Sequence, residues 1–483
     1  MDIIIKYHFS NKGIVLLLST FLVSGLFECS FGQMYNDEHL PSGLSKYSHS
    51  NYSDANYSET LKANNDSEKY YWLPAVEVVG LNLSLWAYHR YLSSEGWSNI
   101  SWKSIKSNFE SGFKWDVDGY LMNQFWHPYH GSNYYNIARS NGLTFWESAP
   151  YALGGSLIWE YFMENEPPSY NDIVNTPITG IILGEISYRI SDLIIDESTT
   201  GSERVFREFF STLVDPMRGF NRILRGDMWK AGEANEPADF HLIVSSGIHN
   251  LFLSSKLNDS KLYAAIRADL NYGDLFAVDS HKNPFDYFTL HVELNIAPDD
   301  NIAGIFASGV IWDGKLKLFV NSKNIVGIYK EVDIHINTIY KLSATSLSSQ
   351  LINTVPLSAS LTLHNYLGLS AILMGATNSQ YASVLGKDYN IGPGASGKVG
   401  AHLIIKYFGE LYLNYKRYWI HTLSGADGEE FVGLLNIGIN YNLFADNSVC
   451  LDLLLYERFG EYVDYPNTQD ANSAVRIYYK HCF

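Results

Sequence analysis

The sequence predicts an α+β protein in which an N-terminal helical module precedes an antiparallel transmembrane β-barrel of about 12 strands. Three features of the 483 residues predict it: a short apolar segment near the start, a middle region with the residue pattern of helices, and strict apolar–polar alternation from Asp239 onwards. A chain of this length is expected to form two or three units. We divide it into a signal peptide (1–32), a disordered polar linker (33–70), a helical module (71–235) and the barrel (236–483).

The N-terminal segment has the features of a secretory signal. Lys6 and Lys12 precede the apolar run Gly13–Phe27, which is too short for a transmembrane helix. Glu28 stands before Cys29, where a lipoprotein signal needs a small residue, so we predict cleavage after Gly32 without lipidation. The following segment has almost no aliphatic residues and cannot offset its ordering entropy, which predicts a disordered linker.

Composition excludes several classes of function. With 34 basic and 51 acidic residues, binding to nucleic acid is improbable, because phosphate contacts need a basic face. Aromatic residues make up 15% of the chain, which suits aromatic girdles at a membrane interface, although an aromatic-rich soluble β protein would share this. No P-loop, Gly-x-Ser-x-Gly or His-Glu-x-x-His motif occurs, and no Cys-x-x-Cys pair indicates a zinc site.

The middle region reads as helices separated by turns. We predict helices at Leu73–Leu92, Phe145–Glu164, Tyr170–Ile195 and Ser202–Leu213. Ser169 and Asp172 form a Ser-x-x-Asp cap at the third of these. Gly180 and Gly184 are four residues apart, so one face of that helix lacks side chains and a neighbouring helix can approach closely.

Two histidines near the start of this region are candidate ligands. His127 and His130 are three residues apart, but Pro128 between them predicts a loop. A metal site would take a third ligand from Glu147, Glu160 or Glu164. The alternative is that both histidines are hydrogen-bonded residues that hold the helices together.

Glu160 and Glu185 lie within apolar helical stretches, where a carboxylate needs a partner or a raised pKa. Arg139 and Arg189 are the available partners, and ion pairs that fix helix register are one interpretation. A general acid–base pair is the other. Because the helices would be antiparallel neighbours, we predict that the two carboxylates lie within about 12 Å of each other.

From Asp239 the residues alternate as in strands with one apolar face, over stretches of roughly 9–13 residues that suit a tilted membrane span. A soluble β-sandwich would also alternate, but the polar face here suits a wet lumen. The even-numbered residues of Asn436–Asn442 are predicted to face that lumen. Gly304–Asn337 is ambiguous, because Asp313-Gly314 is a hairpin signal that would divide it.

The last hairpin makes a specific prediction. The chain ends within a strand at Phe483, and we expect Ala445–Ser448 to be a short periplasmic turn and Phe459–Asn472 a long external connection. A register that pairs residues around that long loop places Cys450 opposite Cys482 on the lumenal face. A disulfide there would be permitted by an oxidising compartment.

Four segments resemble a family of uncharacterised bacterial proteins catalogued as domain of unknown function 3943 (DUF3943). They are Trp115–Gly142, Gly155–Asp172, Thr179–Asp192 and Asp215–Gly226. The resemblance covers Phe109–Gly226 and implies a helical module followed by an outer-membrane barrel. The family has no assigned activity, so the resemblance implies no catalytic residues.

The leading functional hypothesis is a non-enzymatic outer-membrane protein for passage or handling of a small hydrophilic or lipidic compound. Its helical module would lie on the periplasmic side, beneath the barrel or partly plugging it. One alternative is an envelope lipid- or glycan-modifying enzyme with a site formed by His127, His130, Glu147, Glu160 and Glu185. Another is a purely architectural protein. The expected partners are outer-membrane lipid and the barrel-assembly machinery, and no cofactor is predicted.

Overall fold

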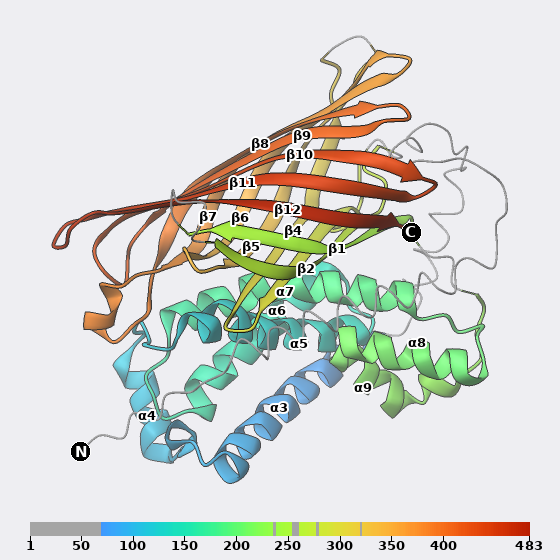
Figure 1. Ribbon diagram of the computed structural model, residues 1–483. Coiled ribbons are helices and arrows are strands. Elements are labelled where there is room, and N and C mark those ends of the chain that lie inside the picture. Colours follow the sequence, from blue (N-terminus) through green and yellow to red (C-terminus); the bar gives the residue numbers. More distant parts are fainter. Residues whose placement is uncertain (1–68, 235–237, 254–259, 277–279, 319–320) are drawn as a thin grey trace.

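The computed structural model describes residues 69–234, 238–253, 260–276, 280–318 and 321–483. A bundle of helices lies along one side of a β-barrel (Figure 1). The predicted signal peptide and nearly all of the predicted linker lie outside the described residues.

Seven α-helices precede the barrel in the described part of the chain. They are α3 (Trp72–Ala87), α4 (Trp102–Ser111), α5 (His127–Ser140), α6 (Phe145–Ile158), α7 (Tyr170–Ile194), α8 (Gly201–Val214) and α9 (Pro216–Arg225). π-Helical turns extend α3 through Leu92 and α6 through Met163, and a third, Met122–Trp126, leads into α5. The four predicted helices are therefore confirmed, whereas α4, α5 and α9 were not predicted.

The predicted loop at His127–His130 is wrong. Both histidines belong to α5, with Pro128 in its first turn. Proline is tolerated there because the first N–H groups of a helix have no partner within the helix.

The packing of α7 against α5 depends on glycine. A Cβ on Gly180 would lie 2.6 Å from the carbonyl carbon of Gly131, and one on Gly184 would lie 2.7 Å from the Tyr135 ring. No other residue fits at either position without a shift of the neighbouring helix. The Ser169 hydroxyl accepts from the Asp172 N–H at 3.2 Å and caps α7. Both predictions for this helix, the close approach and the cap, are confirmed.

Twelve antiparallel strands close into a barrel in which each strand pairs with its sequence neighbours and β1 pairs with β12. The strands are β1 (Phe240–Phe252), β2 (Ser260–Tyr272), β3 (Phe288–Ala297), β4 (Asp300–Lys315), β5 (Lys323–Ile336), β6 (Lys341–Ser358), β7 (Leu361–Asn378), β8 (Tyr389–Ile405), β9 (Gly409–His421), β10 (Gly428–Phe444), β11 (Asn447–Tyr462) and β12 (Thr468–Cys482). The predicted strand number and start are confirmed. Asp313-Gly314 lies within β4 and is not the hairpin turn.

The register of the last hairpin differs from the prediction. Cys450 is opposite Tyr478, so Cys482 lies four residues, or roughly 13 Å, further along the strand. The β11–β12 connection is only residues 463–467, because the ladder continues past Arg458 to the pair of Gly460 with Thr468. Neither thiol is in a disulfide.

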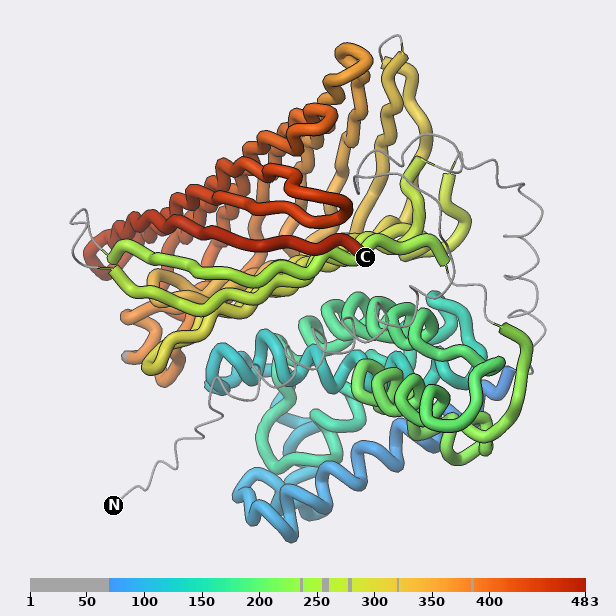
Figure 2. Tube along the Cα trace, turned by 45° about the vertical axis from the view of Figure 1, so that its right-hand side comes forward, coloured from blue at the N-terminus to red at the C-terminus, as the bar shows by residue number. Residues whose placement is uncertain are grey.

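The helical module covers the outer wall of the barrel over β2–β5. Outward apolar side chains of these strands are buried in one core with helical residues; among them are Leu290, Val292, Leu294, Ile305, Val332 and Ile334 from the wall and Phe125, Ile182 and Ile186 from the helices. The Thr179 and Thr345 hydroxyls lie 2.5 Å apart between α7 and β6. Both views show the helices outside the barrel (Figures 1 and 2). The module therefore lies against the wall and not within the lumen, where a plug-like module would lie.

The wall formed by β9–β12 is different. Its outward apolar residues, among them Leu413, Ile437, Leu453, Leu455 and Ile477, are exposed. Asn436, of the opposite parity, lines the lumen, as predicted. An apolar outer band around a polar lumen is the pattern of barrels that cross the outer membrane. Among the described residues, no helix combines the length and hydropathy that a transmembrane helix requires.

Candidate functional site

Two polar regions of the molecule could carry function. The first, the His127 cluster, comprises Asp116, Asp118, His127, Glu160 and Asp172. His127 begins α5, Asp172 is in the first turn of α7, and Glu160 is in the π-helical turn after α6. The two remaining aspartates precede α5 in the segment that connects it to α4. Four separate segments are thus brought to one point.

The imidazole of His127 lies between two carboxylates. Its Nε2 is 3.6 Å from Asp118 Oδ2 and 3.9 Å from Asp172 Oδ1. Asp118 is half exposed at the edge of the cluster, and the side chain of Asp172 is buried. The cluster therefore reaches solvent on the Asp118 side.

Hydrogen bonds hold the other carboxylates. Asp116 accepts from the Ser169 hydroxyl at 2.8 Å and from the amides of Asn171 at 2.6 Å and Asn123 at 2.8 Å. Glu160 accepts from the backbone N–H of Ser169 at 2.6 Å. Asn123 also donates to the Tyr389 hydroxyl of β8 at 2.6 Å, which connects the cluster to the barrel.

Burial favours the protonated form of two carboxyl groups of this cluster. It raises the pKa of Glu160 to about 7 and the pKa of Asp172 well above its ordinary value, and neighbouring carboxylates add to the Asp172 shift. Burial opposes a charge on His127, but the nearby Asp118 carboxylate outweighs it, so the His127 pKa is raised. The cluster can therefore exchange protons near neutral pH, as general acid–base chemistry requires.

His130 lies one turn further along α5 and packs its ring against Trp159, with ring centroids 6.2 Å apart. Burial, followed by the charge on His127, lowers its pKa to about 3, so it is neutral at ordinary pH. His130 is thus a neutral neighbour of the cluster.

Glu147 is not part of the cluster. It forms a capping box with Thr144 at the start of α6 and binds Lys69 at 3.0 Å and the Tyr71 hydroxyl at 2.7 Å. Its place at the N-terminus of a helix explains its conformation without a catalytic role.

Glu185 is held by both predicted partners. Fully buried, it lies 2.7 Å from Arg139 and 2.7 Å from Arg189, and it accepts from the Tyr135 hydroxyl at 2.7 Å. Burial alone would raise its pKa, but the two guanidinium groups lower it below its ordinary value. The structure therefore favours the ion-pair interpretation for Glu185.

The predicted proximity of Glu160 and Glu185 is wrong. Glu160 binds Ser169, the residue before α7, and Glu185 lies sixteen residues further on, roughly 24 Å along the helix. α6 and α7 do contact each other, as predicted. The short connection between them, however, brings Glu160 to the start of α7 and leaves Glu185 near its other end.

Sequence reasoning missed Asp116, Asp118 and Asp172 as members of the cluster. The Asp-x-Asp pattern of Trp115–Gly142 was a usable signal, and Asp172 was interpreted only as part of a helix cap. Among the described residues, no three His, Cys, Asp or Glu side chains are arranged to hold a metal ion.

The second candidate site is a lumenal cavity of about 510 Å³. Charged pairs cross it between strands that are not neighbours. Lys398 binds Glu331 at 3.0 Å and Asp333 at 2.6 Å. Arg476 binds Glu293 at 2.7 Å, between β12 and β3. The lining of the cavity extends through His402, Ile404 and Glu410 to the turn that joins β8 and β9. We call this the open end of the barrel; Phe483 lies at the same end.

An apolar layer closes the cavity on its other side. We call it the tyrosine layer; it consists of Tyr263, Tyr340, Tyr418, Tyr456, Ile339 and Ile420, all buried. Tyr340 and Ile339 belong to the β5–β6 turn and fold over the lumen, where Tyr340 packs against Tyr456 with ring centroids 6.2 Å apart. Beyond this layer Arg458 binds Glu430 and the Asn378 carbonyl, and so joins β11 to the end of β7. The described structure thus has a lumen with one closed end.

Residues 112–217 match the family model described as "Domain of unknown function (DUF3943)", which confirms the resemblance. None of the curated proteins matches this chain. Among solved structures, the barrel is similar to a NanC porin (11% identity, 50% of this chain and 98% of the porin, TM-score 0.28). It is also similar to the outer membrane channel DcaP of Acinetobacter baumannii (10% identity, 51% of this chain and 97% of DcaP, TM-score 0.23). A third similar structure is an outer membrane channel from Pseudomonas putida F1 (9% identity, 52% of this chain and 97% of that channel, TM-score 0.26). Likeness at this level does not identify what this chain binds.

Proposed function

We propose that this chain is an outer-membrane barrel protein that binds a small charged compound in its lumen, entering from the open end. The observation that carries the proposal is a charged cavity of about 510 Å³ that ends at the tyrosine layer. That volume is within the usual range of small-molecule sites. A lumen with one closed end suits binding and handling better than free passage.

We place the open end in the periplasm. Three of its turns, residues 359–360, 406–408 and 445–446, are two or three residues long, as periplasmic turns of such barrels are. In this proposal the end of α7 lies on the periplasmic side, and the module extends from there along the wall to the closed end, where Asn123 binds Tyr389 at the start of β8. The contacts of Arg189 with the Pro284 carbonyl and Asp286, in the β2–β3 connection at this end, support that placement.

Lys416 is the best candidate for the group that recognises an anionic part of the ligand. Its Nζ is 3.8 Å from Asp333, and it lies 4.1 Å from the centroid of the Phe306 ring. Lys398, in contrast, has two closer carboxylates. An anionic ligand would give Lys416 a charge-assisted hydrogen bond at a shorter distance.

The closed end can be tested by planar-bilayer conductance. The native chain is expected to show no steady ion current, because the tyrosine layer blocks the lumen. A Tyr340→Ala/Tyr456→Ala variant is expected to conduct, since both rings are removed from that layer. Leu453→Ala, on the outer face, serves as the matched control and should behave like the native chain. A steady ohmic current through the native protein would contradict the proposal.

Ligand retention can be tested by native mass spectrometry of the purified barrel. A small anionic compound is expected to remain bound in the native chain and to be lost from Lys416→Met. Lys406→Met, in a turn at the barrel end, is the control and should retain the compound. Equal retention by both variants would exclude Lys416 as the recognition residue.

A second candidate function, an envelope lipid- or glycan-modifying enzyme, is supported by one observation: the His127 imidazole lies within 4 Å of two carboxylates. Lipid and glycan profiles of a deletion strain would test it. If the cluster is catalytic, complementation with His127→Gln fails to restore the profile while Glu147→Gln restores it. Restoration by both variants would leave the lumenal proposal and exclude this one.

A further inference from the structure

The hairpin formed by α8 and α9 has an inverted distribution of polar and apolar residues. Six large apolar side chains on its outer face are between 37% and 64% exposed: Val205, Phe209, Leu213, Phe220, Ile223 and Leu224. The opposite side of the hairpin packs on the module through Phe210 and Val214, which join Ile194 of α7 in a small core. We call the six exposed residues the outer face of the hairpin.

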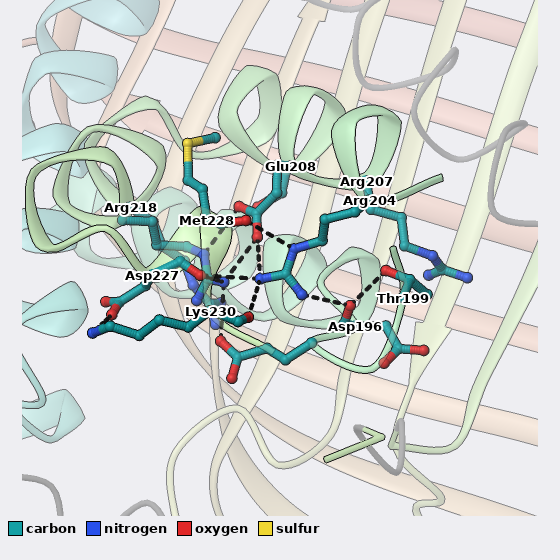
Figure 3. Close-up of polar contacts among 12 residues, drawn as sticks. Asp196, Thr199, Arg204, Arg207, Glu208, Arg218, Asp227, Met228 and Lys230 are labelled. Carbon is teal, nitrogen blue, oxygen red and sulfur yellow. Dashed lines mark hydrogen bonds and ion pairs between the residues drawn. The ribbon is translucent and has the colours of Figure 1, made fainter. Parts of the chain in front are cut away.

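A buried group of charged residues lies between the two helices. Arg222 and Arg204 both bind the buried Glu208 carboxylate, at 2.8 Å and 2.9 Å. Arg204 also donates to the backbone carbonyls of Asp196 and Asp227, at 2.9 and 3.0 Å (Figure 3). These charges are therefore satisfied internally and contribute nothing to the outer face.

An amphipathic helix in water turns its charged side outwards and its apolar side towards the core. The hairpin does the reverse. A contiguous exposed apolar patch marks a surface that meets another apolar phase or partner. Because the buried ion pairs fix both helices, the six apolar residues cannot turn inwards without breaking them.

We propose that the outer face of the hairpin lies in the headgroup–acyl boundary of the membrane that the barrel crosses. The hairpin packs against the last turns of α7. That helix is anchored at Arg189 to the open end of the barrel, which places the hairpin near the level at which the strands leave the bilayer. The proposal rests on the membrane placement of the barrel and not on what the lumen binds.

The residues at the edge of the hairpin fit a lipid surface. Exposed Trp229 follows α9, next to Lys230, and Arg225 ends the helix. Tryptophan and basic residues are the typical anchors at a membrane interface, where they meet the headgroups. Asp227 pairs with both cations, at 2.6 and 3.1 Å, so the edge keeps a net positive charge of one.

The test uses the full chain reconstituted into lipid vesicles. An environment-sensitive fluorophore is attached at Phe209→Cys or Ile223→Cys, in a chain whose native cysteines are replaced by serine. Glu203→Cys, at a partly exposed polar position roughly 120° around the same helix from Phe209, is the matched control. Heat-dependent gel mobility verifies that each barrel is folded.

An interfacial helix buries its apolar face on the order of 5–10 Å into the boundary. The labels at 209 and 223 should therefore be blue-shifted and quenched more strongly by shallow-labelled than by deep-labelled doxyl lipid. The label at 203 should be quenched mainly by aqueous iodide. Equal iodide quenching at 209 and 203 would overturn the proposal. Protection of 209 from both quenchers would also overturn it, because a second copy or another protein segment would then cover the face.

Discussion

Two walls of the barrel carry the same alternation of inward polar and outward apolar residues, and they differ in what touches their outer face. On β3, Leu294 is 2% exposed because the helical module covers it. On β11, Leu453 is 44% exposed and faces outwards without a helix. The same barrel thus has one wall covered by its own helices and another wall that faces lipid.

The difference shows what a strand pattern specifies. Removing an apolar side chain from water is favourable whether a helix or an acyl chain replaces the water. A helix, however, must also match the wall in shape, since protein interiors are packed as densely as crystals. The covered wall should therefore be sensitive to small changes in side-chain volume, whereas lipid can rearrange around the other wall.

The largest loss of stability is expected from breaking the buried ion pairs of Glu185, which join α5 to α7 and hold Arg189 against the barrel. Glu185→Ala leaves Arg139 and Arg189 buried without their shared carboxylate, which should destabilise the module by about 3–5 kcal/mol. Urea unfolding, followed by trypsin cleavage of the module, measures it. The control Lys106→Ala breaks the exposed pair with Glu110 on α4, worth less than about 1 kcal/mol. Equal losses in both variants would contradict the role assigned to Glu185.

The next prediction compares the stability cost of the same Leu→Ala substitution on the covered wall and on the lipid-facing wall. Leu294→Ala leaves a cavity under the helices and should cost about 2–5 kcal/mol. Leu453→Ala should cost about 1 kcal/mol or less, because lipid fills the space and the side chain was half exposed. The midpoint of urea unfolding in vesicles measures both. If the two variants lose the same stability, the walls do not differ in the way described.

The smallest expected effect depends on pH. The Glu160 pKa is about 7 in the folded chain against an ordinary 4.5, so between these values only the folded state keeps the proton. Stability contributed by this group is thus present below pH 4.5 and lost as pH rises through 7, by up to about 3 kcal/mol. Glu160→Gln keeps the acceptor for the Ser169 N–H and cannot ionise.

The variant should therefore match the native chain at pH 4.5 and exceed it in stability at pH 8. Thermal unfolding of the module at both pH values measures this. If the native chain and Glu160→Gln lose the same stability between pH 4.5 and pH 8, Glu160 does not titrate in that range. Because the cluster joins β8 through Asn123, the native module should also loosen from the wall at that end as pH rises.

Much of the fold could be predicted because its signals are local. Period-two alternation marked the strands, and the spacing of Glu185 and Arg189 marked an ion pair on one helix. The glycines Gly180 and Gly184 marked the face on which α5 packs. Each of these depends on residues within a few positions of one another.

The remainder depends on partners distant in sequence. The local sequence around Leu294 and around Leu453 does not indicate whether a helix or lipid covers the side chain. The His127 cluster joins four segments, so only the tertiary fold reveals it. The β11–β12 register was missed because a shift of an even number of residues leaves the pattern of faces unchanged, and only cross-strand pairs such as Asp452 with Arg476 distinguish one register from another.

The covered wall has a consequence for the order of assembly. Strands β2–β5 follow the module and β1 in the chain, so their cover has been synthesised before they have. Loops between sequence neighbours close at a lower entropic cost than the β1–β12 pairing, which joins residues more than 220 positions apart. We therefore expect the module and its wall to form a sheet sealed on one face first, with the lipid-facing strands added in order and the β1–β12 seam closed last.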